Sequence, residues 1–183
     1  MRKIGYKDKS VVENLYKLDD IYCLTSSIYW DGGYQTDATL KDKEKFYHFA
    51  DLFSSAIKDI IVNFDDKAIV GKGISEKPYI FEEWKDIKNY DSYNNLKEYI
   101  NKKSCYEIIL PDDNNIIDYI VENNFRYFTC IDLYLPKIKI ILQPSCHTEV
   151  FIYSKEYELV VPKIKEILKE YPEINLKKYN CGV

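Results

Sequence analysis

Arginine, histidine and glycine are scarce in this sequence, and long apolar runs are absent. Arg2 and Arg126 are the only arginines among 183 residues, and histidine occurs 2 times. Arginine side chains dominate contacts to phosphates and bases, so their scarcity and the net charge of −4 argue against nucleic-acid binding. No stretch reaches the roughly 18 apolar residues of a membrane span, and the N-terminus lacks the apolar run of a signal peptide. We therefore expect a cytoplasmic protein that binds neither nucleic acid nor a membrane.

Motifs for metal and cofactor binding are also missing. The 5 cysteines show no Cys-x-x-Cys spacing and make no familiar zinc set with the histidines; they are Cys23, Cys105, Cys130, Cys146 and Cys181. The paired acids at 19–20, 65–66 and 112–113 lack the spacing of a calcium loop, and helix caps and turns explain them. The run "VGKGIS" lacks the residues of a phosphate-binding loop. We expect free thiols in a reducing compartment, no metal and no cofactor.

Length and composition favour a single globular domain that spans residues 1–183. Hydrophobic residues make up 46% and charged residues 31% of the chain, which is the balance of a folded, soluble protein. Tyrosine occurs 18 times against 6 glycines. Tyrosine suits protein interfaces, because it joins an apolar ring to a polar hydroxyl. A genome rich in A and T produces the same bias, so composition leaves both explanations open.

Apolar residues recur at helical spacing in the first half of the chain. A helix is expected from about Leu40 to "NFDDK", with Thr39 as N-cap and Asp42 three residues on; its apolar positions are Phe46, Phe49, Ala50, Phe53, Ala56, Ile57, Ile60 and Ile61. Strands are expected on either side, in "DDIYCLTSSIYW" and "AIVGKG". A helix capped by Ser92, the strand "CYEIIL" and a helix capped by Asp112 should follow.

The last third shows the clearest strand pattern. The runs "RYFTCIDLYL", "IKIILQ" and "EVFIY" are joined by tight turns, which predicts a three-stranded antiparallel meander. Ser154 should cap a final helix that runs to Tyr171 and is kinked by Pro162. The predicted fold is α+β: an antiparallel or mixed sheet with a C-terminal three-stranded meander and helices mainly on one face.

The turn "PSCHT" places Cys146 beside His147, with Glu149 two residues further on. A cysteine nucleophile needs a base within hydrogen-bond reach, and that base normally comes from elsewhere in the fold. The only other histidine is His48, which falls on the polar side of the first long helix. We therefore expect ordinary turn and surface roles for these residues and assign no catalytic residue.

Acidic residues alternate with large aromatic residues in the irregular stretch from 74 to 103. This mixture is typical of an interface hot spot within a charged rim. We predict that the partner-binding residues are Glu82, Glu83, Trp84, Asp86, Tyr90, Asp91 and Tyr93. The alternative is a loop whose aromatic rings pack on the sheet while its acids face water.

The run from Cys130 to Glu173 resembles the end of a bacterial family of uncharacterised domains that resemble immunity proteins of polymorphic toxin systems. The shared parts are a strand, a turn, a second strand, a hairpin, an alternating strand and a capped helix with a proline near its start, here Pro162. The hairpin of that family carries an acidic pair followed by Arg-Gly, whereas residues 144–147 of this chain read "PSCH". No role is therefore transferred to this loop.

Three functions are open on these grounds. The first is an immunity-type protein that covers the active site of a cognate toxin, and a mildly acidic chain would be steered toward a basic toxin domain. The second is a small enzyme with a carboxylate centre or with Cys146 or Cys130 as nucleophile, which a fast-reacting thiol would reveal. The third is a regulatory or structural interaction module. We favour the first over an enzyme, and the enzyme stays open as an alternative.

Overall fold

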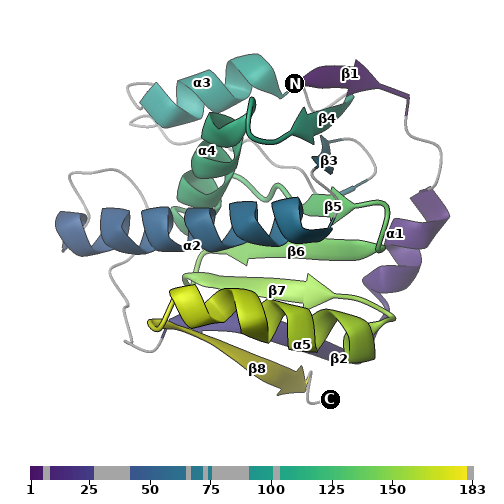
Figure 1. Ribbon diagram of the computed structural model, residues 1–183. Coiled ribbons are helices and arrows are strands. Elements are labelled where there is room, and N and C mark those ends of the chain that lie inside the picture. Colours follow the sequence, from purple (N-terminus) through teal and green to yellow (C-terminus); the bar gives the residue numbers. More distant parts are fainter. Residues whose placement is uncertain are drawn as a thin grey trace.

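The computed structural model describes residues 1–5, 9–26, 42–64, 67–71, 74–75, 91–100 and 104–180. Its strands are β1 (Arg2–Ile4), β2 (Asp20–Ser26), β3 (Lys67–Gly71), β4 (Cys105–Ile109), β5 (Leu133–Leu135), β6 (Ile140–Ser145), β7 (Glu149–Tyr153) and β8 (Ile174–Asn180). These strands form one antiparallel sheet in the order β1-β4-β3-β5-β6-β7-β2-β8 (Figure 1). The predicted α+β fold with an antiparallel sheet is confirmed.

Helices cover the sheet unequally. They are α1 (Lys9–Leu15), α2 (Lys43–Phe64), α3 (Asp91–Tyr99), α4 (Asn114–Phe125) and α5 (Tyr157–Ile167), which continues as a 3₁₀ turn over Leu168–Glu170. The helices α2, α4 and α5 lie over one face of the sheet (Figure 1). Their buried residues share one core with alternate residues of the strands. The other alternate residues, among them Ile69, Tyr134 and Ile141, pack with Val12 and Leu15 of α1. Because neighbouring strand residues point to opposite faces, α1 lies on the second face.

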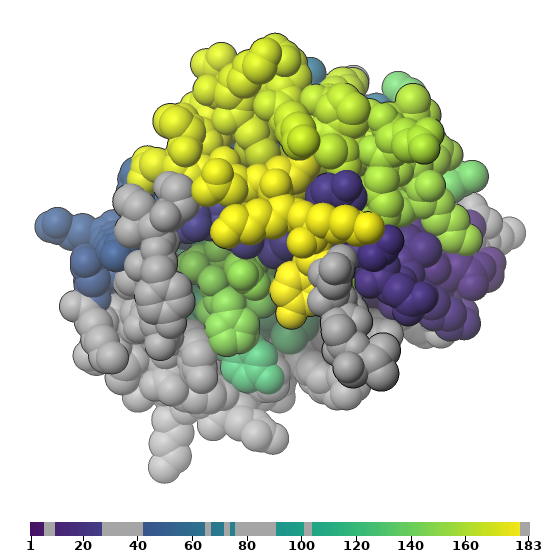
Figure 2. Space-filling view, turned by 90° about the horizontal axis from the view of Figure 1, so that it is seen from below, coloured from purple at the N-terminus to yellow at the C-terminus, as the bar shows by residue number. Residues whose placement is uncertain are grey.

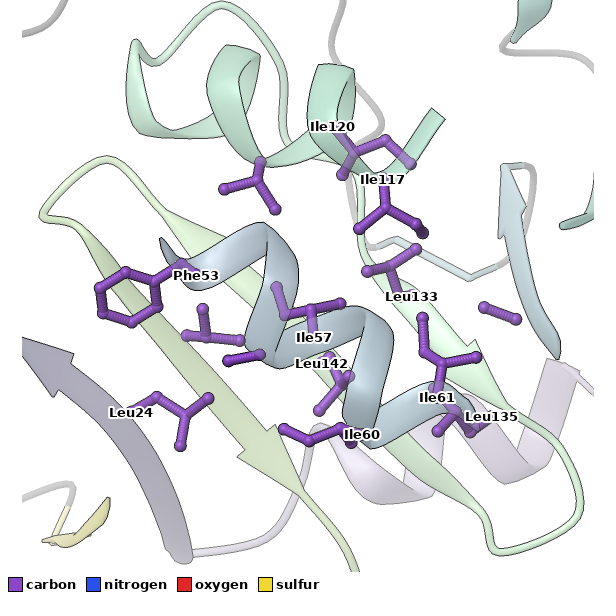
Figure 3. Close-up of a cluster of buried hydrophobic side chains, with 14 of the residues drawn as sticks. Leu24, Phe53, Ile57, Ile60, Ile61, Ile117, Ile120, Leu133, Leu135 and Leu142 are labelled. Carbon is purple, nitrogen blue, oxygen red and sulfur yellow. The ribbon is translucent and has the colours of Figure 1, made fainter. Parts of the chain in front are cut away.

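The long helix α2 supplies much of the main core. Its side chains Phe53 and Ile57 lie in one buried cluster with strand residues and with Ile117 of α4 (Figure 3), and all three are fully buried. Burial of a side chain of this size stabilises the fold by roughly 1.5–3 kcal/mol. The helix begins at Lys43, where the Asp42 carboxylate accepts a hydrogen bond of 3.1 Å from the backbone N–H of residue 45. Asp42 is therefore the N-cap, and the predicted cap Thr39 lies outside the described residues.

The predicted meander is confirmed by the pairing of β5, β6 and β7. Leu133 pairs with Leu142, and Ser145 pairs with Glu149 across the second turn. The first strand is much shorter than predicted, because β5 begins only at Leu133. Residues 126–128 instead form the C-terminal cap of α4, as described below.

Several predicted helix ends are shifted. Ser92 lies inside α3, and Asp113 rather than Asp112 precedes α4. The Ser154 hydroxyl accepts a hydrogen bond of 3.0 Å from the N–H of Glu156, and this places the first turn of α5 after Glu156. None of the helices in the described part of the chain has the length and apolarity needed to cross a membrane.

Strand β8 is an element that the sequence did not predict. It follows the 3₁₀ turn and pairs with β2 over seven residue pairs, from Asp20↔Asn180 to Ser26↔Ile174. Figure 2 looks onto this edge of the sheet, where β8, in yellow, lies at the surface. The side chain of Ile174 is buried, whereas those of Lys177 and Lys178 are exposed. Lysines on an edge strand disfavour pairing with other chains.

Candidate functional site

The predicted partner-binding stretch is only partly described. Glu82, Glu83, Trp84, Asp86 and Tyr90 lie outside the described residues. Asp91 is exposed in the first turn of α3.

Tyr93 is a correction to that prediction. Its side chain is only 3% exposed, and its ring lies edge-on to the ring of Phe128 with 6.1 Å between centroids. The cause is the packing of α3 on α4, where Asn123 donates a hydrogen bond of 3.1 Å to the Ser92 hydroxyl. Tyr93 therefore belongs to the core and offers no ring to a partner.

A cavity of about 140 Å³ lies where the "PSCHT" turn meets the segment that follows α4. Its lining includes Tyr127, Cys130, Asp132, Gln143, Cys146 and Phe151. Two of the cysteines considered as nucleophiles thus face one cavity. Pockets with a few convergent polar groups are the usual places for binding or chemistry, so we treat this cavity as the candidate site.

The edge of this cavity is set by the end of α4. The N–H of Phe128 donates to the carbonyl oxygen of Asn123 at 2.8 Å, and the N–H of Tyr127 donates to that of Asn124 at 2.9 Å. These two bonds define a Schellman motif, in which the residue after the C-cap adopts a left-handed conformation and is usually glycine. Here that residue is Tyr127, with φ of 62° and a side chain that is 42% exposed. A non-glycine residue in this conformation costs roughly 1–2 kcal/mol.

This helix end explains why the strand predicted over 126–135 forms only over Leu133–Leu135. Residues 126 to 128 complete the cap of α4, so their backbone N–H groups bond to the helix instead of a neighbouring strand. The run "RYFTCI" has the aromatic and β-branched composition of a strand. This composition reflects the packing of side chains, so an irregular segment that packs against the sheet can have it as well.

The amide of Asn124 holds the irregular segment in place. Its Nδ2 donates to the carbonyl oxygens of Ile131 and Pro144, at 2.9 and 3.0 Å. Its Oδ1 accepts hydrogen bonds from the Thr129 hydroxyl and the Ile131 N–H. Asn124 is 2% exposed, so every polar atom of this side chain is satisfied inside the protein. One side chain therefore joins α4, the segment before β5, and β6.

A buried carboxylate lies beside the cavity. The Asp132 side chain is 2% exposed and accepts hydrogen bonds from the Tyr16 hydroxyl and, at 3.2 Å, from Gln143 Nε2. The Tyr153 hydroxyl donates to Gln143 Oε1 at 2.9 Å, and the N–H of Asp132 donates to the Ser75 hydroxyl at 2.8 Å. Residues far apart in sequence thus form one polar network on the second face of the sheet. No sequence motif marks it, because its members come from unconnected segments.

The two thiols of the cavity are poor nucleophiles at neutral pH. Burial raises the pKa of Cys130 to about 11, and the negative charge of Asp132 and the neighbouring Cys146 add to the effect. Burial also raises the pKa of Cys146, although the Ser145 side chain opposes the shift with a hydrogen bond. The thiolate is the reactive form, so these values count against either cysteine as a resting nucleophile.

Neither histidine supplies a base to these thiols. His147 is exposed in the turn, and His48 on α2 lies 3.0 Å from the Glu173 carboxylate. Among the described residues no hydrogen bond joins a histidine to a cysteine, and no group of three or more metal-ligating side chains gathers. The predicted turn and surface roles agree with these positions.

Comparisons with protein-family models, with curated proteins and with solved structures found no match to this chain. The resemblance of residues 130–173 to immunity-type domains therefore stays a prediction.

Proposed function

We propose that the protein binds another protein through the surface around the Tyr127 cavity, and that it is an immunity-type inhibitor covering the active site of a bacterial toxin. The observation that carries the proposal is Tyr127 itself. A large aromatic side chain, 42% exposed, is held beside a cavity by a backbone conformation that favours glycine. Residues with strained backbone cluster at functional sites.

The surroundings of Tyr127 favour contact with a protein. Tyrosine is among the residue types that dominate interface energetics, particularly beside pockets that exclude water. The Asn124 hydrogen bonds fix the segment that carries Tyr127, so little conformational freedom would be lost when a partner binds. A preformed cavity beside an aromatic residue on a fixed backbone can receive one side chain of a partner.

The charge of the chain supports a basic partner. The net charge is −4, and acidic inhibitors associate faster with basic targets because long-range attraction steers the encounter. Many toxin domains that act on nucleic acid need a basic active-site surface, which an acidic protein complements. A regulatory interaction module would use the same surface and would differ only in its partner.

A pull-down with matched variants tests the proposal. The tagged chain is used to capture proteins from its native cells at low salt, in parallel with the variants Tyr127→Gly and Lys139→Gly. Lys139 also has a positive φ, of 52°, but it lies in the exposed turn between β5 and β6. Both variants therefore remove a side chain from a residue with left-handed backbone. Only Tyr127→Gly removes a side chain that lines the candidate cavity.

The expected result is one basic protein that is held by the wild type and by Lys139→Gly, is lost with Tyr127→Gly, and is released by salt. The activity of that protein should fall when it is mixed with the wild type in equal amounts. Capture that is equal in all three proteins would contradict the proposed surface, and a captured partner whose activity is unchanged would contradict inhibition.

A further inference from the structure

We propose that the candidate cavity receives a cationic side chain of the protein partner, lysine or arginine, which is held by the Asp132 carboxylate and the rings of Tyr127 and Phe151. All three residues line the cavity. The inference rests on the proposed function, because it names the kind of residue that the partner inserts. It also has a test of its own, because a free organic cation can probe the cavity without the partner.

The size of the cavity suits a single side chain. Its volume is about 140 Å³. Pockets that take drug-sized molecules have volumes of roughly 300–1,000 Å³. A nucleotide or a large cofactor is therefore too big for this cavity, whereas the end of one amino-acid side chain fits its size.

The Asp132 carboxylate supplies a negative charge to this space. Its Oδ2 atom accepts hydrogen bonds from the Tyr16 hydroxyl and, at 3.2 Å, from Gln143 Nε2. Both donors are uncharged, so these bonds orient the carboxylate and favour its ionised form without cancelling its charge. Among the described residues that line the cavity, Asp132 is the only one with a formal charge at neutral pH. This lining favours a cation over an anion.

Aromatic rings complete the lining. Phe151 is the strand partner of Gln143, so its ring lies on the same face of the sheet as the hydrogen bond from Gln143 to Asp132. The Phe151 ring also lies edge-on to the ring of Tyr179, with 5.4 Å between centroids. Tyrosine and phenylalanine rings attract lysine and arginine cations within about 6 Å of the ring centre, most strongly where water is excluded.

The two thiols of the cavity indicate the sign of the local field. Burial raises the pKa of Cys130 to about 11, and the charge of Asp132 is the next cause of the shift. Burial also raises the pKa of Cys146, and the charge of Glu149 adds to this shift although hydrogen bonds, including that of Ser145, oppose it. A field that disfavours a thiolate at these sulfurs favours a cation in the same space.

The lining can offset the cost of removing water from a cation. A buried cation is stabilised only when an opposite charge and further favourable contacts replace its hydration shell. The Asp132 carboxylate provides the charge, and the rings of Tyr127 and Phe151 provide the contacts. Arginine is also enriched among interface hot spots, which agrees with a basic partner.

The test is an NMR titration of the isotope-labelled full chain with small probes. The probes n-butylammonium and n-propylguanidinium reproduce the ends of lysine and arginine, and n-butanol and butyrate are the neutral and anionic controls. We expect the cations to shift the backbone amide signals of Tyr127, Cys130 and Cys146 with a Kd on the order of 1–10 mM. Both controls should bind about tenfold more weakly or not at all.

Two charge-removing variants locate the cation. Asp132→Asn keeps the shape of the side chain and should weaken cation binding about tenfold. Asp112→Asn makes the same change in net charge at an exposed residue before α4, outside the described lining, and should bind the cations like the wild type. This pair separates a local contact from general attraction to an acidic chain.

Four results would overturn the inference. In the wild type they are binding of n-butanol as tight as that of the cations, tighter binding of butyrate, or no saturable shift with either cation. The fourth is unchanged cation binding by folded Asp132→Asn. A partner can still be captured through Tyr127 when the cavity binds no cation, so these results leave the proposed function standing. A pull-down without a partner would instead contradict the proposed function and leave the measured cation preference in place.

Discussion

Asn124 donates a hydrogen bond of 3.0 Å from its side-chain amide to the carbonyl oxygen of Pro144, twenty residues further along the chain. The same buried amide bonds to three more groups, two on Ile131 and one on Thr129. The Asn124 side chain therefore ties the segment that carries Tyr127 and Cys130 to the sheet at several points.

Asn124→Ala should lower the free energy of unfolding by about 3 kcal/mol, because it leaves buried backbone groups without partners, each at a cost of about 1–3 kcal/mol. Asn115→Ala is the matched control, since Asn115 is exposed on the same helix and should change stability by no more than about 0.5 kcal/mol. Denaturant unfolding measures both. Equal effects of the two substitutions would show that the Asn124 hydrogen bonds contribute little.

At position 127, the glycine variant should be more stable than the alanine variant, which is the reverse of the order inside a helix. Both replacements remove the ring, but only alanine keeps the cost of the left-handed backbone, so Tyr127→Gly should be about 1 kcal/mol more stable than Tyr127→Ala. Inside α4 the order reverses, and Asn115→Ala should be about 1 kcal/mol more stable than Asn115→Gly. Thermal or denaturant unfolding of the four variants decides the point, and the same order at both positions would argue against the Schellman motif.

Glu107 should make stability depend on acid pH. It lies between Arg2 and Lys67, with N–O distances of 2.5 and 3.2 Å. Burial alone would raise its pKa, but the hydrogen bonds and charges of Lys67 and Arg2 outweigh burial and the pKa is lowered. The folded state thus binds fewer protons than the unfolded chain, whose glutamate pKa is about 4.3. The stability from Glu107 is present above that pH and is lost as the pH falls through the folded-state pKa.

Glu107→Gln should therefore flatten the fall of unfolding free energy below about pH 4.3. Glu166→Gln is the control, because Glu166 pairs with Lys169 on the exposed face of α5, where both side chains are about two-thirds exposed or more. Such surface pairs contribute little. Urea unfolding at a series of pH values should show the change in slope only for the Glu107 variant, and parallel pH profiles of that variant and the wild type would contradict it.

The sequence predicted the elements whose side chains repeat at one clear period. The spacing from Phe46 to Ile61 predicted α2, and alternation with tight turns predicted the β5-β6-β7 meander. Strand β8 was missed because its apolar residues Ile174 and Leu176 are followed by Lys177 and Lys178, which hide the alternation. The pairing partner of β8 is β2, more than a hundred residues earlier, and no local pattern indicates that contact.

The candidate site was only partly predictable. "PSCHT" was recognised as a turn with a cysteine, but its place beside Cys130 depends on the Asn124 hydrogen bonds and on the end of α4. In a sequence, a Schellman motif is usually recognised by a glycine after the helix, and here Tyr127 occupies that position. The buried Asp132 network depends on tertiary contacts with Tyr16 and Gln143, which sequence spacing does not encode.

The measurement that tests the central claim most directly is the dissociation constant of the captured partner for the wild type, Tyr127→Gly and Lys139→Gly, by titration calorimetry. If Tyr127 is an interface hot spot worth about 2 kcal/mol, its loss weakens binding about thirtyfold while Lys139→Gly binds like the wild type. Unchanged affinity of Tyr127→Gly would contradict the account and place the binding surface elsewhere on the protein.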